Sequence, residues 1–328
     1  MKNSFVVFEA PYQVATLKGK LSQPKAGELL VQVQFSAISP GTEMLVYRGL
    51  VPSEMRQDES ISSLQENFEY PMQYGYACVG EVIQVGDSSL ESWIGKRVFA
   101  FQPHQHYFVS PPAGVIPIPD EVEFEDALFF ANLETAVNLV QDAAPVLGER
   151  GVLFGLGVVG LLTALVLNQF PLTALTLVEP HSYRQTMAQR LGLNQVVFPK
   201  DIFSDQKYDF AMEISGSPTA LQQAINVVGF DGRIIVGSWF GTKLVSLDLG
   251  TTFHRQRLRL ISSQVSSISP ALVNRWDKAR RTIVVWQLLK QLKPRQLITH
   301  HFPIDDAALA YQFIAQQPES CVQVVLTY

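Results

Sequence analysis

Apolar and polar residues alternate in short segments over the first third of the chain, and turn residues separate one segment from the next. In residues 29–41, Val31, Val33 and Phe35 alternate with polar residues, which is the two-residue period of a half-buried strand. Similar segments occupy residues 5–11, 77–86 and 97–101. These patterns predict a mainly β N-terminal half.

Beyond the proline-rich residues 111–122, apolar strands alternate with helices. The predicted helices cover residues 125–143, 182–192, 218–228 and a segment from about 158, and the predicted strands cover residues 151–155, 175–180, 196–198, 209–215 and 232–238. This alternation predicts an α/β unit, a parallel sheet wound with helices on both faces. The alternating arginines of residues 254–260 predict another strand, and two helices (275–292 and 305–317) and a strand (321–328) follow.

Composition and charge narrow the class of protein. The chain has 328 residues, of which 47% are apolar and 17% charged, so it is long and apolar enough for two domains with separate cores. The formal charge of −5 disfavours binding to nucleic acid or to anionic lipid. An apolar run of 20 residues from Gly151 is broken by glycines, which favours a buried strand, turn and helix over a membrane span. With Cys78 and Cys321 as its only cysteines, the chain is expected in a reducing cytoplasm.

A glycine-rich turn supplies the clearest chemical signal. Gly155, Gly157 and Gly160 form the G-x-G-x-x-G pattern between an apolar strand and an apolar helix. That context is typical of a dinucleotide-binding turn, in which the helix N-terminus faces a pyrophosphate. Glu179, at the end of the next strand, is the acid expected to hold the ribose hydroxyls, and its charge favours NAD over NADP. Arg184 leaves NADP possible because it could accept a phosphate. The other residues predicted to bind the cofactor are Val158, Val159, Gly216 and Gly237.

The order of these parts resembles the medium-chain, zinc-type alcohol dehydrogenase superfamily. The resemblance rests on LLVQVQFSAIS, YGYACVGEVIQVG, IGKRVFAF, the glycine turn and FDGRIIVGSW. It implies a GroES-like catalytic domain over residues 1–131, completed by 265–328, with a Rossmann domain inserted at 132–264. It also implies a homodimer that acts on a small-molecule substrate. The segments ISPGTEMLVYRG, PHQ and FHRQRLRLISSQV are most similar to the bacteriochlorophyllide a dehydrogenase branch, whose members oxidise a hydroxyethyl group on a chlorin ring with NAD.

The chain departs from this family at the zinc ligands. By the resemblance, Ser39, Tyr76 and Ala77 stand where zinc-binding members have cysteine, histidine and glutamate, and residues 131–135 contain no cysteine or histidine. Hydroxyl groups are poor substitutes for the N, S or carboxylate ligands of zinc. The four-cysteine structural lobe is missing as well. We therefore expect no zinc in either site and assign no residue as a metal ligand, whereas a different metal site built from distant histidines stays open.

Without a metal, hydrogen-bond donors must stabilise the charge on the substrate oxygen during hydride transfer. By the resemblance, Thr42 matches the hydroxyl that contacts this oxygen, and Tyr76 could donate and relay a proton, although a packed aromatic in a turn would look the same. Ser39 is a weaker candidate, since S-P-G-T is also an ordinary turn. His104 and Glu134 could complete the proton path, or they could be a solvated loop histidine and a charge near a helix N-terminus.

Together these features predict an NAD(H)-dependent, zinc-independent oxidoreductase. It would transfer a hydride between nicotinamide and a secondary alcohol or ketone. By analogy with the bacteriochlorophyllide branch, this substrate could carry a bulky ring. One alternative is a quinone or enoyl reductase that uses NADPH. Another is a non-catalytic protein that binds a dinucleotide but turns nothing over.

Overall fold

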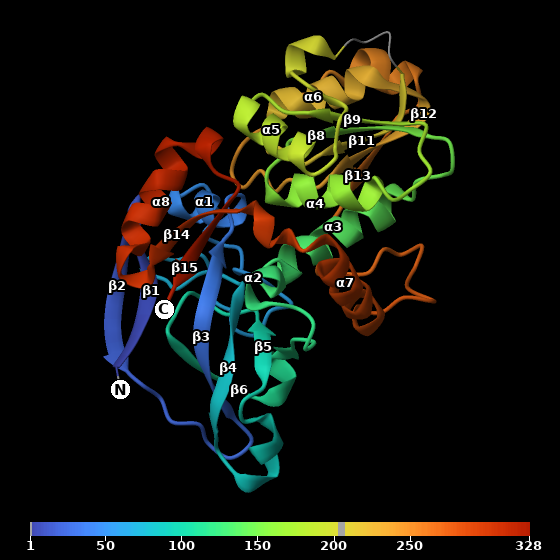
Figure 1. The fold of residues 1–328 in the computed structure, drawn as a ribbon. Coiled ribbons are helices and arrows are strands. Elements are labelled where there is room, and N and C mark those ends of the chain that lie inside the picture. Colours follow the sequence, from blue (N-terminus) through green and yellow to red (C-terminus); the bar gives the residue numbers. More distant parts are fainter. Residues whose placement is uncertain (1, 203–206) are drawn as a thin grey trace. The chain divides into compact units, whose positions relative to one another are not determined.

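Figure 1 shows the fold in a computed structural model, which describes residues 2–202 and 207–328. The chain forms two compact units, unit 1 with Met1–Ala131 and Trp286–Tyr328, and unit 2 with Asn132–Val285. The return to unit 1 thus occurs at Trp286, 21 residues beyond the predicted residue 265. Arg281 accounts for this difference, because its guanidinium donates to the carbonyl oxygens of Val265 and Ser267 at 2.5 and 3.3 Å and keeps this segment in unit 2.

Unit 2 is built on a six-stranded parallel sheet in the order β10-β9-β8-β11-β12-β13. The strands are β8 (Arg150–Phe154), β9 (Ala174–Val178), β10 (Val196–Val197), β11 (Tyr208–Glu213), β12 (Val228–Val236) and β13 (Arg259–Ser262). The helices wholly within unit 2 are α4 (Val158–Leu167), α5 (Ser182–Arg190) and α6 (Pro218–Val227). The unit also contains α3 (Phe130–Ala143) from Asn132 onward and α7 (Lys278–Leu292) up to Val285. The strand order reverses between β8 and β11, and ligands of doubly wound sheets bind at such a point, outside the carboxyl ends of the strands.

The strands of this parallel sheet carry buried side chains at consecutive positions, as in β8 and β11, so both faces of the sheet are covered. Val152 and Phe154 of β8 and Ile234 of β12 are buried against Leu221 and Ile225 of α6. Near-continuous apolar strands of this kind are expected where helices cover a parallel sheet. The predicted α/β class with a doubly wound parallel sheet is confirmed.

Unit 1 is mainly β, as the alternating pattern predicted. A hairpin of β1 (Lys2–Ala10) and β2 (Gln13–Lys20) accompanies a second sheet in the order β14-β15-β3-β4-β5-β7, with β6 paired to β3. The strands of this sheet are β3 (Leu29–Ile38), β4 (Cys78–Val85), β5 (Arg97–Ala100), β6 (Tyr107–Ser110), β7 (Ile116–Pro117), β14 (Ile298–Pro303) and β15 (Gln323–Thr327), and the helices are α1 (Thr42–Tyr47), α2 (Phe124–Ala127) and α8 (Ala307–Gln316). The central strand β3 ends at Ile38, so it delivers the chain directly into the turn that carries Ser39 and Thr42.

One predicted strand is wrong. Of residues 254–260, only Arg259 and Leu260 belong to a strand, since β13 begins at Arg259, and a short π-helix precedes this segment at Leu249–Phe253. Arg257 has a φ of +54°, a left-handed conformation outside the extended region of a regular strand, and the chain is a turn at this residue. The three arginines therefore do not share one face of a strand.

No helix within the described ranges combines the length and the apolarity needed to cross a lipid bilayer.

Candidate functional site

The glycine turn of unit 2 lies between the carboxyl end of β8 and the first turn of α4. Gly155 has a φ of +99°, and a β-carbon there would lie 2.7 Å from the Ser215 Cα atom. Gly157 caps α4 without a side-chain hydrogen bond, and a β-carbon added to it would meet no protein atom within 4 Å. Gly157 therefore leaves open space at the N-terminus of the ten-residue helix α4, which fits a bound pyrophosphate.

Glu179 is tied to this turn. The residue is 1% exposed. Its Oε2 accepts a hydrogen bond from the Leu156 N–H at 2.7 Å, and its Oε1 accepts one from the His181 N–H at 3.0 Å. The acid predicted to hold the ribose thus also holds the glycine turn in place. Arg184 lies in the first turn of α5, three residues beyond His181.

The other residues predicted for the cofactor lie at the same end of the sheet or beside it. Val158 is buried in the first turn of α4, next to the half-buried Val159. Gly216 has a φ of +67° and donates its N–H to Ser238 Oγ at 2.8 Å. A β-carbon at Gly237 would lie 2.5 Å from Leu139 Cδ2, so this glycine is needed for packing.

Sequence reasoning missed a second acid at this end of the sheet. Glu213, the last residue of β11, is fully buried; its Oε1 accepts the N–H and the hydroxyl of Ser215 at 2.7 and 2.6 Å. Within the described part of the chain, its Oε2 is buried and has no hydrogen-bond partner. The available signal was an acid at the end of an apolar strand, the same feature that pointed to Glu179.

In unit 1, three hydroxyl groups gather where β3 ends and α1 begins. The Tyr76 hydroxyl donates to Ser39 Oγ at 2.6 Å, and Thr42, the first residue of α1, is close enough to Tyr76 for its side chain to lower the pKa of the phenol. Ser39 is buried and Tyr76 is partly buried. We call Ser39, Thr42 and Tyr76 the hydroxyl cluster; the structure thus brings together three of the five residues predicted to be catalytic.

The Tyr76 phenol keeps its proton. Burial raises the pKa of Tyr76 to about 12, and the nearby Glu43 carboxylate adds to the rise, whereas hydrogen bonding to Ser39 and Thr42 opposes it. A phenol with this pKa is a neutral hydrogen-bond donor at physiological pH. The hydroxyl cluster can therefore donate to an oxygen atom that gains negative charge.

His104 is fully buried and belongs to a chain of polar side chains behind the hydroxyl cluster. Its Nε2 lies 2.9 Å from Glu43 Oε2, and its Nδ1 lies 2.7 Å from Ser36 Oγ. Ser36 Oγ is in turn 2.7 Å from the Tyr328 hydroxyl, and the Tyr311 hydroxyl donates to Glu43 Oε2. Sequence reasoning missed Glu43, whose only signal was its place in the first turn of a helix beside Thr42.

Glu134 lies in unit 2, whereas the four other residues predicted to be catalytic lie in unit 1. Its Oε1 accepts a hydrogen bond from Arg281 Nε at 3.0 Å and lies 2.9 Å from Arg281 Nη2 in an ion pair, and the Arg281 side chain is fully buried. Burial raises the pKa of Glu134, and the charge of Arg281 opposes the rise. Arg281 also donates to Asn138 Oδ1 at 2.9 Å, so this carboxylate is a member of a buried ion-pair network.

Among the described residues, no three His, Cys, Asp or Glu side chains gather closely enough to hold a metal ion. The absence of zinc stays a prediction that rests on the chemistry of Ser39 and Tyr76.

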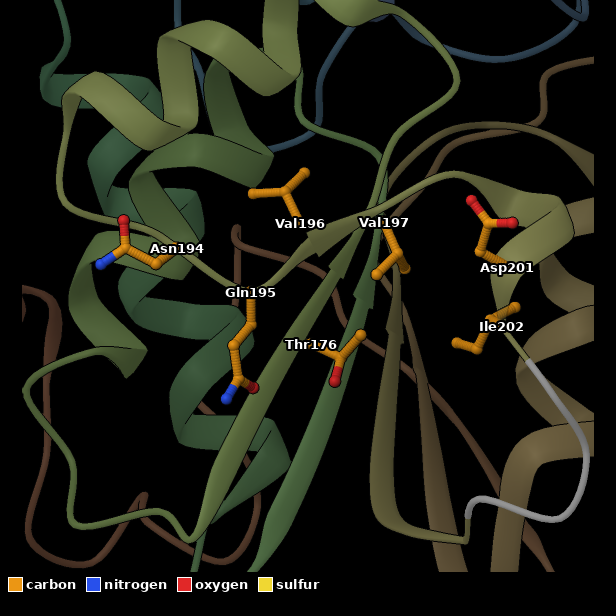
Figure 2. A pocket seen from close by; sticks show the side chains of 7 residues that line it. All are labelled: Thr176, Asn194, Gln195, Val196, Val197, Asp201 and Ile202. Carbon is orange, nitrogen blue, oxygen red and sulfur yellow. The ribbon is translucent and has the colours of Figure 1, made fainter.

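A hollow of about 300 Å³ at the β9–β10 edge is lined by Thr176, Gln195, Asp201 and their neighbours (Figure 2). None of the residues predicted to bind the cofactor lines it.

Comparisons with known proteins were made over the whole chain. No family model matches it. It is 22% identical over 350 residues to D-guloside 3-dehydrogenase of Escherichia coli (strain K12), with 98% of this chain and 99% of that protein covered. It is 25% identical over 348 residues to 2-desacetyl-2-hydroxyethyl bacteriochlorophyllide A dehydrogenase of Rhodobacter capsulatus, with 100% and 99% covered. The solved structure described as a short chain alcohol dehydrogenase from Escherichia coli CFT073, complexed with the cofactor NADH, has a TM-score of 0.80 at 19% identity and covers 100% of this chain and 99% of that one.

These comparisons confirm the predicted fold and the predicted resemblance to the zinc-type alcohol dehydrogenases. The bacteriochlorophyllide branch is among the relatives. The named relatives are dehydrogenases, which bears out the prediction that the chain resembles enzymes of this class.

Proposed function

We propose that the protein is an NAD(H)-dependent oxidoreductase that transfers a hydride between nicotinamide and a secondary alcohol or ketone without zinc. The observation that carries this proposal is the 2.6 Å hydrogen bond from the Tyr76 hydroxyl to Ser39 Oγ. The two hydroxyls stand at positions that the resemblance assigns to zinc ligands. A protonated phenol beside a serine offers the substrate oxygen hydrogen-bond donors in place of a metal.

The chemistry of the hydroxyl cluster suits ketone reduction. A bound nicotinamide supplies the hydride to a ketone or accepts one from an alcohol. As the carbonyl oxygen gains charge, Tyr76 would turn its proton from Ser39 Oγ to that oxygen and donate it, and the hydroxyls of Ser39 and Thr42 would turn to donate to the phenolate that remains. A proton from solvent would then restore the phenol for the next turnover. In the oxidation direction the same proton returns to Tyr76.

The residues that would hold the dinucleotide are those of unit 2. The backbone of Gly157, Val158 and Val159 would receive the pyrophosphate, and the Glu179 carboxylate would receive the adenosine ribose. Its negative charge repels a 2′-phosphate and so favours NAD over NADP.

Three finer points complete the proposal. The edge strand β13, whose Leu260 is 41% exposed, could pair with its copy in a second subunit, which would make a homodimer.

Cys78 and Cys321 are both free and buried, which agrees with a reducing cytoplasm. Because one relative is named as a bacteriochlorophyllide dehydrogenase, the substrates to be tested include one with a bulky ring.

The proposal is tested by titrating purified, metal-analysed protein with NADH and NADPH, followed by nicotinamide fluorescence. Oxidation of the bound cofactor is then measured against ketones, quinones and a chlorin. The expected result is tighter binding of NADH, less than stoichiometric zinc, and turnover of a ketone.

The contrary outcomes point to the alternatives. Stoichiometric bound zinc would remove the metal-free mechanism. Preference for NADPH with quinone turnover would favour the quinone or enoyl reductase, and cofactor binding without turnover of any substrate would favour a non-catalytic role.

A further inference from the structure

We propose that the buried pair of Glu43 and His104 positions both sides of the hydroxyl cluster, as a protein-built replacement for a metal centre. This inference rests on the proposed function, in which the cluster holds the substrate oxygen. Ser39 and Tyr76 lie on different segments of the chain, 37 residues apart. A hydrogen bond between two such segments keeps its geometry only if something fixes each of them.

Glu43 fixes the side that carries Ser39. The Ser39 N–H donates to Glu43 Oε1 at 2.9 Å, and the Glu43 N–H donates to the Ser39 carbonyl oxygen at 3.2 Å. This reciprocal pair closes the turn between β3 and α1 and leaves Ser39 Oγ free to accept from Tyr76. Such pairing at a helix start satisfies backbone groups that the helix itself leaves unbonded.

His104 fixes the side that carries Tyr76. Gly75, the residue before Tyr76, has a φ of +126°, and a β-carbon there would lie 2.7 Å from His104 Nε2. The imidazole therefore packs directly against the backbone of Gly75, while the Ala77 carbonyl oxygen accepts the Ala37 N–H at 2.9 Å. The same nitrogen atom, Nε2, faces Glu43, so one imidazole contacts both segments.

The pair is itself held on every side. His104 Nδ1 faces Ser36 Oγ, and Glu43 Oε2 accepts from the Tyr311 hydroxyl as well as facing His104. Glu43, His104 and Ser36 are fully buried. A buried carboxylate needs this many partners, because an unpaired one is very costly. Since a buried pair gives little net stability, its main effect is to fix geometry.

The first test measures Tyr76 without any substrate. Full-length protein labelled with tyrosine that carries ¹³C at Cζ is titrated by NMR, and the Tyr76 signal is assigned by its loss in Tyr76→Phe. Because the Glu43 charge is one cause of the raised pKa of Tyr76, Glu43→Gln should lower that pKa from about 12 toward its ordinary value. A pKa that does not fall in Glu43→Gln overturns the inference.

The second test compares two tyrosine variants that each lose one hydroxyl bonded to α1 or its side chains. Tyr311→Phe removes a donor to Glu43 but keeps the ring that stacks on Tyr47. Tyr70→Phe is the matched control, since its hydroxyl donates to the Val46 carbonyl oxygen of the same helix. The kcat for ketone reduction should fall about tenfold or more in Tyr311→Phe, as expected for misplaced reacting groups, with the Kd for NADH unchanged. Tyr70→Phe should keep its kcat.

The outcomes separate the inference from the proposed function. Equal kcat in Tyr311→Phe and Tyr70→Phe overturns the positioning role even if both proteins are equally stable. Full activity of Tyr76→Phe, with the Tyr76 pKa still dependent on Glu43, overturns the proposed function and leaves the positioning geometry intact. If no ketone is turned over, the NMR titration alone decides the inference.

Discussion

Gly160 on α4 lies so close to Gly155 that a β-carbon added to Gly160 would be 1.9 Å from the Gly155 carbonyl oxygen. The third glycine of the turn therefore allows the helix to approach the strand, whereas the second glycine faces open space. Two glycines of one motif thus serve different purposes, packing for Gly160 and ligand access for Gly157.

Alanine at these two positions should separate folding from binding. Gly160→Ala has to displace backbone, so unit 2 should unfold at a clearly lower urea concentration. Gly157→Ala meets no protein atom and should change stability little, but its methyl group would stand where a pyrophosphate must approach. We expect the Kd for NADH to rise about tenfold or more, equivalent to about 1.4 kcal/mol. Unchanged NADH affinity in a well-folded Gly157→Ala protein would place the pyrophosphate elsewhere.

A second prediction concerns Glu179. Glutamine at this position replaces one of two oxygens that each accept a backbone N–H, so one buried N–H loses its partner, at a cost of about 1–3 kcal/mol. Losing the negative charge should also improve NADPH binding relative to NADH. Urea denaturation and fluorescence titration measure the two effects.

Asp201→Asn is the charge-matched control for Glu179→Gln. Asp201 is exposed and belongs to the same unit, so its variant makes the same change in net charge without touching the glycine turn. If both variants shift the NADPH preference equally, the effect comes from net charge and not from a contact at the ribose.

The features that could be predicted from sequence are local ones. The turn from Gly155 to Gly160 and the acid at Glu179 follow from short spacings, because a strand, a tight turn and a helix N-terminus are neighbours along the chain. The hydrogen bond between Glu43 and His104 joins residues 61 positions apart, and that between Glu134 and Arg281 spans 147 positions. No pattern of local periodicity contains such a pairing, because it depends on how the elements pack.

Conformation at single residues limits prediction in the same way. The arginines at 255, 257 and 259 have the spacing of a strand face, yet Arg257 takes a left-handed φ. The Asp231 N–H donates to the Gln256 carbonyl oxygen at 2.8 Å, a tertiary contact that holds this segment as a turn. Alternation of residue types cannot reveal such a contact.

The ion pair of Glu134 and Arg281 should contribute strongly to the stability of unit 2. Glu134→Ala leaves the fully buried Arg281 guanidinium without its carboxylate, and breaking a buried pair in this way costs about 3–5 kcal/mol. Urea denaturation followed by circular dichroism measures the loss. Glu121→Ala is the contrasting control, since the Glu121–Lys290 pair is well exposed and exposed pairs contribute little. Similar midpoints for the two variants would contradict a structural role for Glu134.

The hydroxyl of Tyr76 should control the rate of ketone reduction and its dependence on pH. A positioned proton donor contributes about 10²–10⁴-fold to rate, so Tyr76→Phe should lower kcat by at least about 100-fold while the Kd for NADH stays the same. Because burial raises the pKa of Tyr76 to about 12, the phenol remains protonated through the neutral and mildly alkaline range. The kcat of the unmodified protein should therefore stay level there and fall only as the pH approaches the Tyr76 pKa. Steady-state kinetics over this range, with Tyr70→Phe as the control for loss of a phenol, checks both statements. A fall in kcat near neutral pH that persists in Tyr76→Phe would assign the proton transfer to a different group, since removing the phenol would leave that titration in place.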